Sequence, residues 1–144
     1  MRLISHRGNI IGPNPEEENT IPYICRALAC GYNVEIDVWE INGELFLGHD
    51  EPKVPAALDF LQESRLWCHA KNEQALFFLL QNKIHCFWHE NDKYTLTSHG
   101  IAWVYPGQQL LPNSVAVKPE GHYTSKQLSH CYGVCSDYIA LFKI

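Results

Sequence analysis

Short apolar runs, separated by Gly, Pro and Asn, recur at close intervals along the whole chain and limit how it can fold. Runs of this length, bounded by turn residues, predict β-strands. We expect eight main strands, over residues 3–6, 33–41, 66–70, 84–88, 94–97, 101–105, 114–117 and 133–136. The Asn42-Gly43 turn predicts a return strand over 44–48. Helical spacing predicts helices over 20–30, 55–63, 73–81 and 125–131, and a terminal turn or helix over 137–144.

Strands joined by helices indicate an α/β protein with a parallel sheet. We predict a single domain over residues 1–144, a compact (β/α)8 TIM-type barrel with several helices shortened or replaced by loops. Eight units leave 18 residues each in a chain of 144, whereas ordinary barrels of this kind have about 250 residues. The segments 89–93, 98–100 and 106–113 are too short for crossover helices. An open α/β sheet is therefore the structural alternative.

Charge and composition exclude several classes of protein. Eleven Lys and Arg against sixteen Asp and Glu give a net charge of −5. We therefore expect no nucleic-acid partner, because duplex binding depends on neutralising phosphates. No apolar run approaches the roughly 18 residues that span a bilayer, so a membrane is not an expected partner. Residues 1–6 leave no room for the apolar region of a secretory signal, and we expect a cytoplasmic protein whose six cysteines are buried structural thiols.

Polar side chains gather where the first predicted strands end. His6 and Arg7 end the first strand, His49 follows the hairpin return, and His69 and Lys71 end the third. In a barrel, the carboxyl ends of successive strands surround one mouth, so we expect these side chains to meet there. Two histidines beside a carboxylate pair favour an acid/base couple.

Glu35 and Asp37 form that carboxylate pair. They are two positions apart on the second predicted strand, so both side chains leave on the same face. They alternate with Val34, Ile36 and Val38, whose burial under the helices would turn the carboxylates into the barrel. Two inward carboxylates repel each other unless a cation binds them. Oxygen ligands of this kind suit Mg²⁺ or Ca²⁺.

Four motifs follow one another within about the first fifty residues: Ser5-His6-Arg7-Gly8, Glu18-Asn19-Thr20, Val34-Glu35-Ile36-Asp37-Val38 and Gly48-His49-Asp50. In order and spacing they resemble the motifs of the glycerophosphodiester phosphodiesterases. Cys68-His69-Ala70-Lys71 is similar to that family's third strand, which carries Glu-x-Lys, and residues 133–138 are similar to its closing strand. Each motif alone is weak, whereas the set is specific.

The resemblance implies a TIM barrel that hydrolyses a small phosphodiester, by default a glycerophosphodiester, with a divalent ion and two catalytic histidines. It assigns the acid/base roles to His6 and His49. It assigns phosphate binding to Arg7 and Lys71, and metal binding to Glu35 and Asp37 with position 69. Glu18 and Asn19 would support the site, with the Asn19 amide reaching a substrate or a metal-bound water.

One position departs from the family pattern. His69 stands where the family has a third metal-binding Glu. Imidazole favours Mn²⁺ or Zn²⁺ over Ca²⁺. The departure is consistent with an altered metal preference, with a weaker metal site, or with a site completed by Glu90 or Glu120.

Two other functions compete with hydrolysis. A phospholipase D-like lyase would use the same site but form a cyclic phosphate, with the substrate's own hydroxyl as nucleophile. A non-catalytic module that binds phosphodiesters would keep the fold without turnover, and His69 in place of Glu is its main support. A barrel without outer helices would also expose apolar strand surface, which predicts a homodimer that size-exclusion chromatography would detect.

Overall fold

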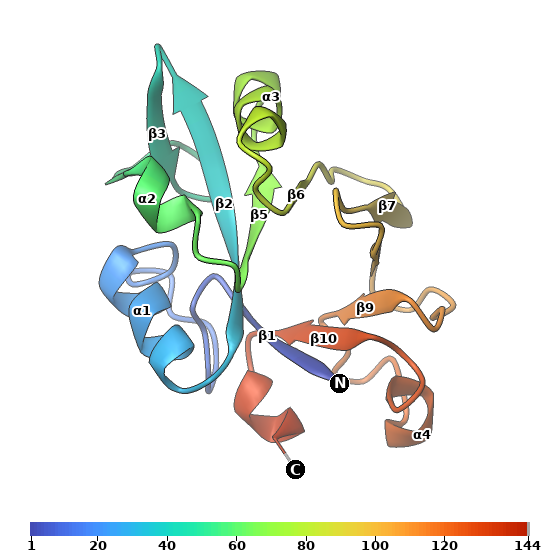
Figure 1. Cartoon of the computed structure of the whole chain (residues 1–144). Helices are drawn as coiled ribbons and strands as arrows, with labels where there is room; N and C mark the ends of the chain where they lie inside the picture. Colours follow the sequence, from blue (N-terminus) through green and yellow to red (C-terminus); the bar gives the residue numbers. More distant parts are fainter. Residues whose placement is uncertain (144) are drawn as a thin grey trace.

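The computed structural model of the chain describes residues 1–143, so Ile144, the last position of the predicted terminal turn or helix and of the predicted domain, lies outside the described residues. Within residues 1–143 there are ten strands, four short α-helices and one 3-10 helix (Figure 1). The strands are β1 (Arg2–His6), β2 (Asn33–Ile41), β3 (Glu44–Leu47), β4 (Val54–Ala56), β5 (Leu66–Ala70), β6 (Cys86–Phe87), β7 (Tyr94–Leu96), β8 (Ala102–Val104), β9 (Ser114–Val117) and β10 (Gly133–Ser136). The helices are α1 (Ile21–Ala29), α2 (Leu58–Leu61), α3 (Glu73–Gln81), α4 (Ser125–Leu128) and η1 (Ile139–Phe142).

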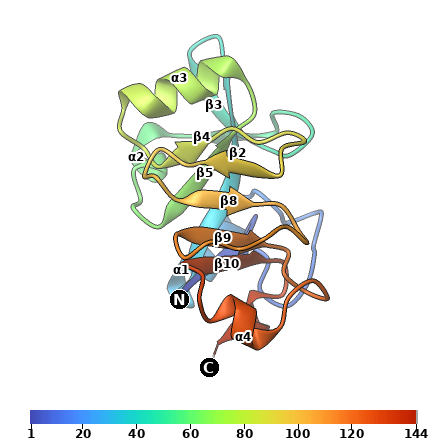
Figure 2. The same cartoon turned by 90° about the vertical axis from the view of Figure 1, so that its right-hand side faces the viewer.

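These strands form one curled mixed sheet, so the prediction of a (β/α)8 TIM-type barrel is wrong. Seven strands run parallel to their neighbours, in the order β6-β5-β2-β1-β10-β9-β8. The strands β3, β4 and β7 pair antiparallel at the margins. Within residues 1–143 no strand ladder joins β6 to β8, and the sheet is a half-barrel (Figures 1 and 2).

The segment between β6 and β8 is the physical reason that the barrel does not form. Residues 88–101 contain no crossover helix, and they form instead the small strand β7, which turns back to pair antiparallel with β8. The backbone amide of Ser98 donates to the carbonyl of Cys86 at 2.8 Å, which holds this hairpin against β6. The segment predicted as the fifth barrel strand, residues 94–97, therefore lies between β6 and β8 but does not join them in one parallel ladder.

Strand β2 organises the half of the sheet that carries the carboxylates. Its first part pairs with β1, its last part pairs with β3, and β5 pairs along its other edge. The turn between β2 and β3 is made by Asn42 and Gly43, whose φ angles are 52° and 85°, as the Asn-Gly signal predicts. The side chain of Asn72 caps α3 by accepting from the amide of Ala75, and its amide donates to the carbonyl of Glu40 in β2.

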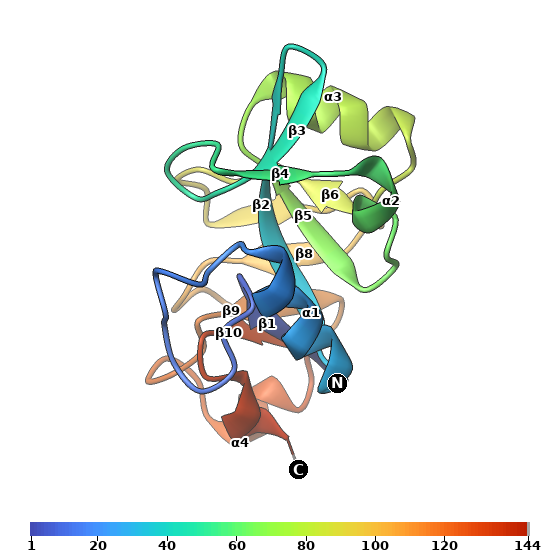
Figure 3. The same ribbon diagram turned by 90° about the vertical axis from the view of Figure 1, so that its left-hand side faces the viewer.

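Two apolar layers lie on opposite sides of the sheet. On the convex side, Val34, Ile36 and Val38 are fully buried and belong to one core with residues of α1 and α3, as expected (Figure 3). On the concave side, Trp67 and Phe87 pack against Trp103, with ring centroids 5.9 and 4.6 Å from it. Glu35 and Asp37 alternate with the valines and the isoleucine, so their side chains enter the concave side.

Some local predictions are wrong. The helix predicted over 55–63 is divided into the edge strand β4 and the single turn α2, because Val54–Ala56 pairs with β3. Cys25 and Cys30 are exposed rather than buried, since they lie on and just after the outer side of α1, while the other four cysteines are buried free thiols.

Among the described residues, no helix combines the length and the apolar character that crossing a membrane requires.

Candidate active site

The parallel register of β1, β2 and β5 brings the predicted site residues together. His6 in β1 is the register partner of Glu35 in β2, and Asp37 in β2 is the register partner of His69 in β5. Partners in neighbouring strands send their side chains to the same face of a sheet. All four side chains therefore face the inside of the curl, where the sequence predicts one shared site.

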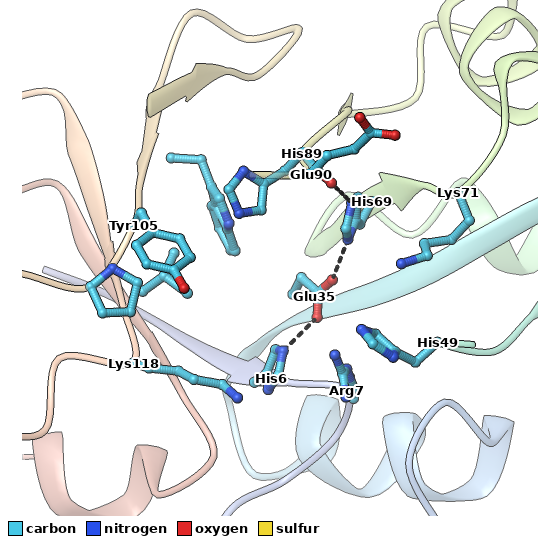
Figure 4. A pocket seen from close by; sticks show the side chains of 13 residues that line it. His6, Arg7, Glu35, His49, His69, Lys71, His89, Glu90, Tyr105 and Lys118 are labelled. Carbon is cyan, nitrogen blue, oxygen red and sulfur yellow. Dashed lines mark hydrogen bonds and ion pairs between the residues drawn. The ribbon is translucent and has the colours of Figure 1, made fainter. Parts of the chain in front are cut away.

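His6, Glu35 and His69 line a cavity of about 400 Å³ at the carboxyl ends of the strands (Figure 4), and Asp37 is buried behind them. One wall holds the histidines, Glu35 and the cations from β1, β2, β5 and the loop after β3. The opposite wall is more apolar and comes from the ends of β6, β8 and β9. Its residues are His89, Glu90, Trp103, Tyr105, Pro106, Val117 and Lys118.

The two carboxylates are almost completely buried. Glu35 is 2% exposed and Asp37 is 0% exposed. Oε2 of Glu35 and Oδ1 of Asp37 have no hydrogen-bond partner among the described residues. Burial, followed by the charge of Asp37, raises the pKa of Glu35 well above its ordinary value. The chain by itself thus holds one carboxylate charged and disfavours a second charge beside it.

Asp37 is the carboxylate that stays charged. Burial alone would raise its pKa, but the neighbouring His69, Arg7 and Asn19 together outweigh burial and hold the pKa well below its ordinary value. The Asn19 amide donates to Oδ2 of Asp37 at 2.9 Å, and its carbonyl oxygen accepts from the Asp37 backbone amide at 3.0 Å. Asn19 therefore positions Asp37, and this pairing occupies the amide that we expected to reach a substrate or a water.

Arg7 connects two of the predicted acidic residues. Its Nε lies 3.2 Å from Oδ2 of Asp37, and its Nη1 donates to Glu18 at 3.3 Å. Arg7 and Asn19 have φ angles of 56° and 60°, a left-handed conformation that residues other than Gly rarely adopt. Backbone strain of this kind concentrates at functional sites. The strained backbone of Asn19 and the contact of Glu18 with Arg7 are consistent with the supporting role predicted for Glu18 and Asn19.

His69 stands between the carboxylates and the opposite wall. Its Nδ1 is 3.1 Å from Oδ1 of Asp37 and 3.8 Å from Oε1 of Glu35. Its Nε2 is 2.9 Å from the backbone carbonyl of His89. The three side chains of Glu35, Asp37 and His69 each offer a ligand atom, and these atoms lie within 4.8 Å of one another. This group matches the predicted metal ligands.

His6 is oriented by a residue that the sequence analysis did not single out. Nδ1 of His6 lies 2.7 Å from Oδ1 of Asp137, which follows β10. Burial lowers the pKa of His6, although the bond to Asp137 acts in the opposite direction. Asp137 also accepts from the amide of Asn9 at 2.8 Å and lies 3.5 Å from Nζ of Lys118. The sequence signal that could have identified Asp137 was its position directly after the predicted strand over residues 133–136.

His49 enters the cavity from the loop between β3 and β4 and is partly exposed (Figure 4). Its Nδ1 is 2.7 Å from Oδ1 of Asp50. Gly48 gives this loop its shape: its φ is 154°, and a Cβ there would collide with the backbone carbonyl of Glu51. The indole of Trp39 donates to the Gly48 carbonyl at 2.6 Å.

The remaining predicted residues lie at the edge of the site. Nζ of Lys71 is 3.8 Å from Oδ1 of Asp37. Glu90 lines the cavity on the side of His89, outside the ligand group. Glu120 is exposed and accepts a hydrogen bond from the hydroxyl of Ser136. Of the two carboxylates considered for completing the metal site, neither belongs to the cluster that the described residues form.

Comparison with known proteins adds no relative: no protein-family model matches the chain, and neither a curated protein nor a solved structure matches it.

Proposed function

We propose that the protein is a metal-dependent phosphodiesterase that hydrolyses glycerophosphodiesters or a related small phosphodiester. The observation that carries the proposal is the buried pair Glu35 and Asp37, each with an unpartnered oxygen, next to a cavity that Glu35 lines together with His6 and His49. The motif resemblance supports the choice of substrate class. The proposed site uses the ends of β1, β2, β5 and β10, so it needs no closed barrel.

The donor set fits a divalent cation. A buried polar atom without a partner costs about 1–3 kcal/mol, and this site contains two such oxygens, Oε2 of Glu35 and Oδ1 of Asp37. A cation held by Glu35, Asp37 and His69 would remove that cost and the repulsion between the carboxylates. When bound, such an ion would polarise a phosphoryl oxygen and offset the charge that develops on it.

Cations around the cavity would hold the substrate phosphate. Arg7 and Lys71 lie beside Asp37, and Lys118 reaches the cavity from the end of β9. Guanidinium and ammonium groups bind phosphate oxygens through charge-assisted hydrogen bonds. Because these cations approach from different strands, they would fix the phosphate between His6 and the loop that carries His49.

His6 is suited to act as the general base. Since its Nδ1 donates to the carboxylate of Asp137, Nε2 keeps its lone pair and faces the interior of the site, 3.8 Å from Glu35. A lowered pKa keeps this imidazole neutral at neutral pH. Nε2 would accept the proton of the attacking hydroxyl while the oxygen of that hydroxyl forms its bond to phosphorus.

His49 is suited to act as the general acid. It enters the cavity from the other side of Arg7, and Asp50 orients its ring. It would give a proton to the leaving oxygen as the bond from that oxygen to phosphorus breaks. If the attacking group is water, the product is an open phosphomonoester. If it is a neighbouring hydroxyl of the substrate, the product is a cyclic phosphate, as in the lyase alternative.

Turnover of glycerophosphocholine by metal-stripped protein tests the proposal. Mg²⁺, Ca²⁺, Mn²⁺ or Zn²⁺ is restored separately, and products are identified by ³¹P NMR. We expect ion-dependent release of a phosphomonoester or a cyclic phosphate, with a loss of at least about 100-fold in His6→Ala and His49→Ala. His130→Ala is the matched control, since His130 is exposed and lines a different cavity.

Two results would contradict hydrolysis. If folded protein turns over neither glycerophosphocholine nor other small phosphodiesters with any ion, the non-catalytic binding module becomes the better interpretation. If the His6→Ala and His49→Ala variants keep full activity, the acid/base assignment is wrong.

A further inference from the structure

We infer that the site selects a transition ion such as Mn²⁺ or Zn²⁺ over Ca²⁺ and Mg²⁺, because His69 presents its Nδ1 to the carboxylates as a nitrogen ligand. The inference deepens the proposed function and rests on it only for the location of the ion. It concerns which ion this chain accepts and is tested without substrate.

The hydrogen bond to His89 determines which nitrogen of His69 is free. Nε2 lies 2.9 Å from the backbone carbonyl of His89, and a carbonyl oxygen only accepts hydrogen bonds. Nε2 must therefore carry the hydrogen. Nδ1 is therefore the nitrogen that an ion could bond to, and when it does so its lone pair points toward the carboxylates.

That lone pair faces other acceptors. Nδ1 is 3.1 Å from Oδ1 of Asp37 and 3.8 Å from Oε1 of Glu35. Acceptor atoms converge in this way where a cation bonds to all of them. Zinc bonds of about 2.0–2.2 Å in a tetrahedral arrangement would place neighbouring ligand atoms roughly 3.4 Å apart. The separation of His69 and Asp37 is already close to this value.

The packing around the His69 imidazole fixes the orientation of its ring. Its ring stacks on Phe87 with centroids 5.1 Å apart and an angle of 8° between the planes. The His89 segment that holds Nε2 is itself anchored, because Nδ1 of His89 lies 3.0 Å from Asp92 and the Thr95 hydroxyl donates to the Trp88 carbonyl at 2.8 Å. A partner that fixes the second nitrogen of a ligating histidine sets its tautomer and orientation.

The number of available oxygens is too small for Ca²⁺. Calcium takes about six to eight oxygen ligands. Oδ2 of Asp37 is already engaged by Asn19 and Arg7, so Asp37 offers one oxygen. With Glu35 and one imidazole nitrogen, the site provides the mixed nitrogen and oxygen donors that Mn²⁺ and Zn²⁺ accept more readily than Ca²⁺ or Mg²⁺.

Measuring ion binding to the full chain directly tests the proposed ion selectivity. Each ion is titrated into chelator-treated protein by isothermal calorimetry, in wild type, His69→Glu and the exposed-surface control His130→Gln. We expect Mn²⁺ and Zn²⁺ to bind wild type and the control at least about tenfold more tightly than Ca²⁺. His69→Glu should reverse this preference toward Ca²⁺ and Mg²⁺. His69→Gln, which can still donate to the His89 carbonyl, should weaken the binding of every ion.

Pulsed electron paramagnetic resonance of the Mn²⁺-loaded protein identifies the ligand. A directly bound ¹⁴N should be detected in wild type and His130→Gln and should be absent from His69→Glu. Ca²⁺ or Mg²⁺ binding as tight as that of Mn²⁺, or Mn²⁺ bound without a nitrogen ligand, would overturn the inference. The absence of any ion binding would also overturn it.

The two proposals fail in different ways. Selective Mn²⁺ or Zn²⁺ binding without turnover of any phosphodiester would reject the phosphodiesterase and leave the ion selectivity in place. Turnover that depends on Ca²⁺ or Mg²⁺, together with tight binding of those ions, would support the phosphodiesterase and reject the selectivity.

Discussion

His6 and Asp137 are separated by 131 positions in the chain, yet Nδ1 of the imidazole lies 2.7 Å from a carboxylate oxygen of Asp137. The contact exists because β10 pairs in parallel with β1, so both residues stand at the same end of neighbouring strands. Burial would raise the pKa of Asp137, but the hydrogen bonds from His6 and Asn9 and the charge of Lys118 outweigh it and hold the pKa below its ordinary value. Asp137 therefore remains a carboxylate and fixes the tautomer of His6.

Asp137→Asn should lower kcat/KM by about 100-fold or more while leaving the fold intact, because an amide no longer enforces a free Nε2 on His6. The measurement is the pH dependence of kcat/KM, whose acidic limb should move in the variant. Asp59→Asn serves as a matched control, since Asp59 is exposed on α2 and does not line the cavity. An unchanged profile in Asp137→Asn would show that Asp137 does not position the base.

Glu35→Gln should stabilise the protein when a chelator removes divalent ions. The pKa of Glu35 is higher in the folded chain than in the unfolded chain, so at pH values above 4.5 the native state must take up a proton or bear an unfavourable buried charge. The carboxyl therefore costs stability as the pH rises above that value. At neutral pH, we expect the variant to gain about 1–3 kcal/mol in the free energy of unfolding measured with urea.

Asp37→Asn should have the opposite effect and destabilise the ion-free protein. Asp37 is charged, accepts from Asn19 and lies 3.2 Å from Nε of Arg7, so its removal leaves a half-buried guanidinium without that partner. The expected loss is about 2–4 kcal/mol in the same urea experiment. Equal changes in Glu35→Gln and Asp37→Asn would contradict the different roles that their contacts assign to the two carboxylates.

His85 should add to the pH dependence of stability although it lies outside the candidate site. Burial, followed by the charge of His99, lowers the pKa of His85 from 6.5 to about 4. The unfolded chain binds this proton at a higher pH than the native chain, so stability is full above 6.5 and decreases as the pH falls toward 4.

His85→Phe should reduce that decrease, by up to about 3 kcal/mol at the acidic end, since Phe cannot take up a proton and can still pack against Trp67. Chemical unfolding of both proteins across this pH range is the test. His122→Phe, at an exposed histidine, should leave the wild-type pH dependence unchanged. Parallel curves for wild type and His85→Phe would contradict the expectation.

Gly48→Ala should displace the loop that carries His49. A Cβ at this position collides with the backbone carbonyl of Glu51, which cannot move as a flexible side chain can. We expect a loss of about 2 kcal/mol or more in stability and a lower kcat/KM. Gly121→Ala is the control, because its φ of 75° is also positive but nothing lies within 4 Å of an added Cβ. It should lose only the smaller cost of the left-handed conformation.

Local patterns in the sequence were enough to predict most elements and the members of the site. Five elements have the bounds that the sequence predicts: β2, β5, β9, β10 and α3. Each contains apolar residues at the spacing of its element and is followed by Asn or a charged residue. The period of two in β2 also determined that Glu35 and Asp37 share a face and that the apolar residues between them pack under the helices.

Tertiary structure alone decided how those elements close around the site. The sequence pattern of a strand does not specify whether it pairs parallel or antiparallel. Residues 94–96 pair antiparallel with β8, and this pairing leaves the barrel open. Asp137 reaches His6 only because β10 lies beside β1, and Nδ1 of His69 is the free nitrogen only because the His89 carbonyl arrives from the end of β6. Such contacts join residues distant in the chain, and they depend on strand order, which no local periodicity encodes.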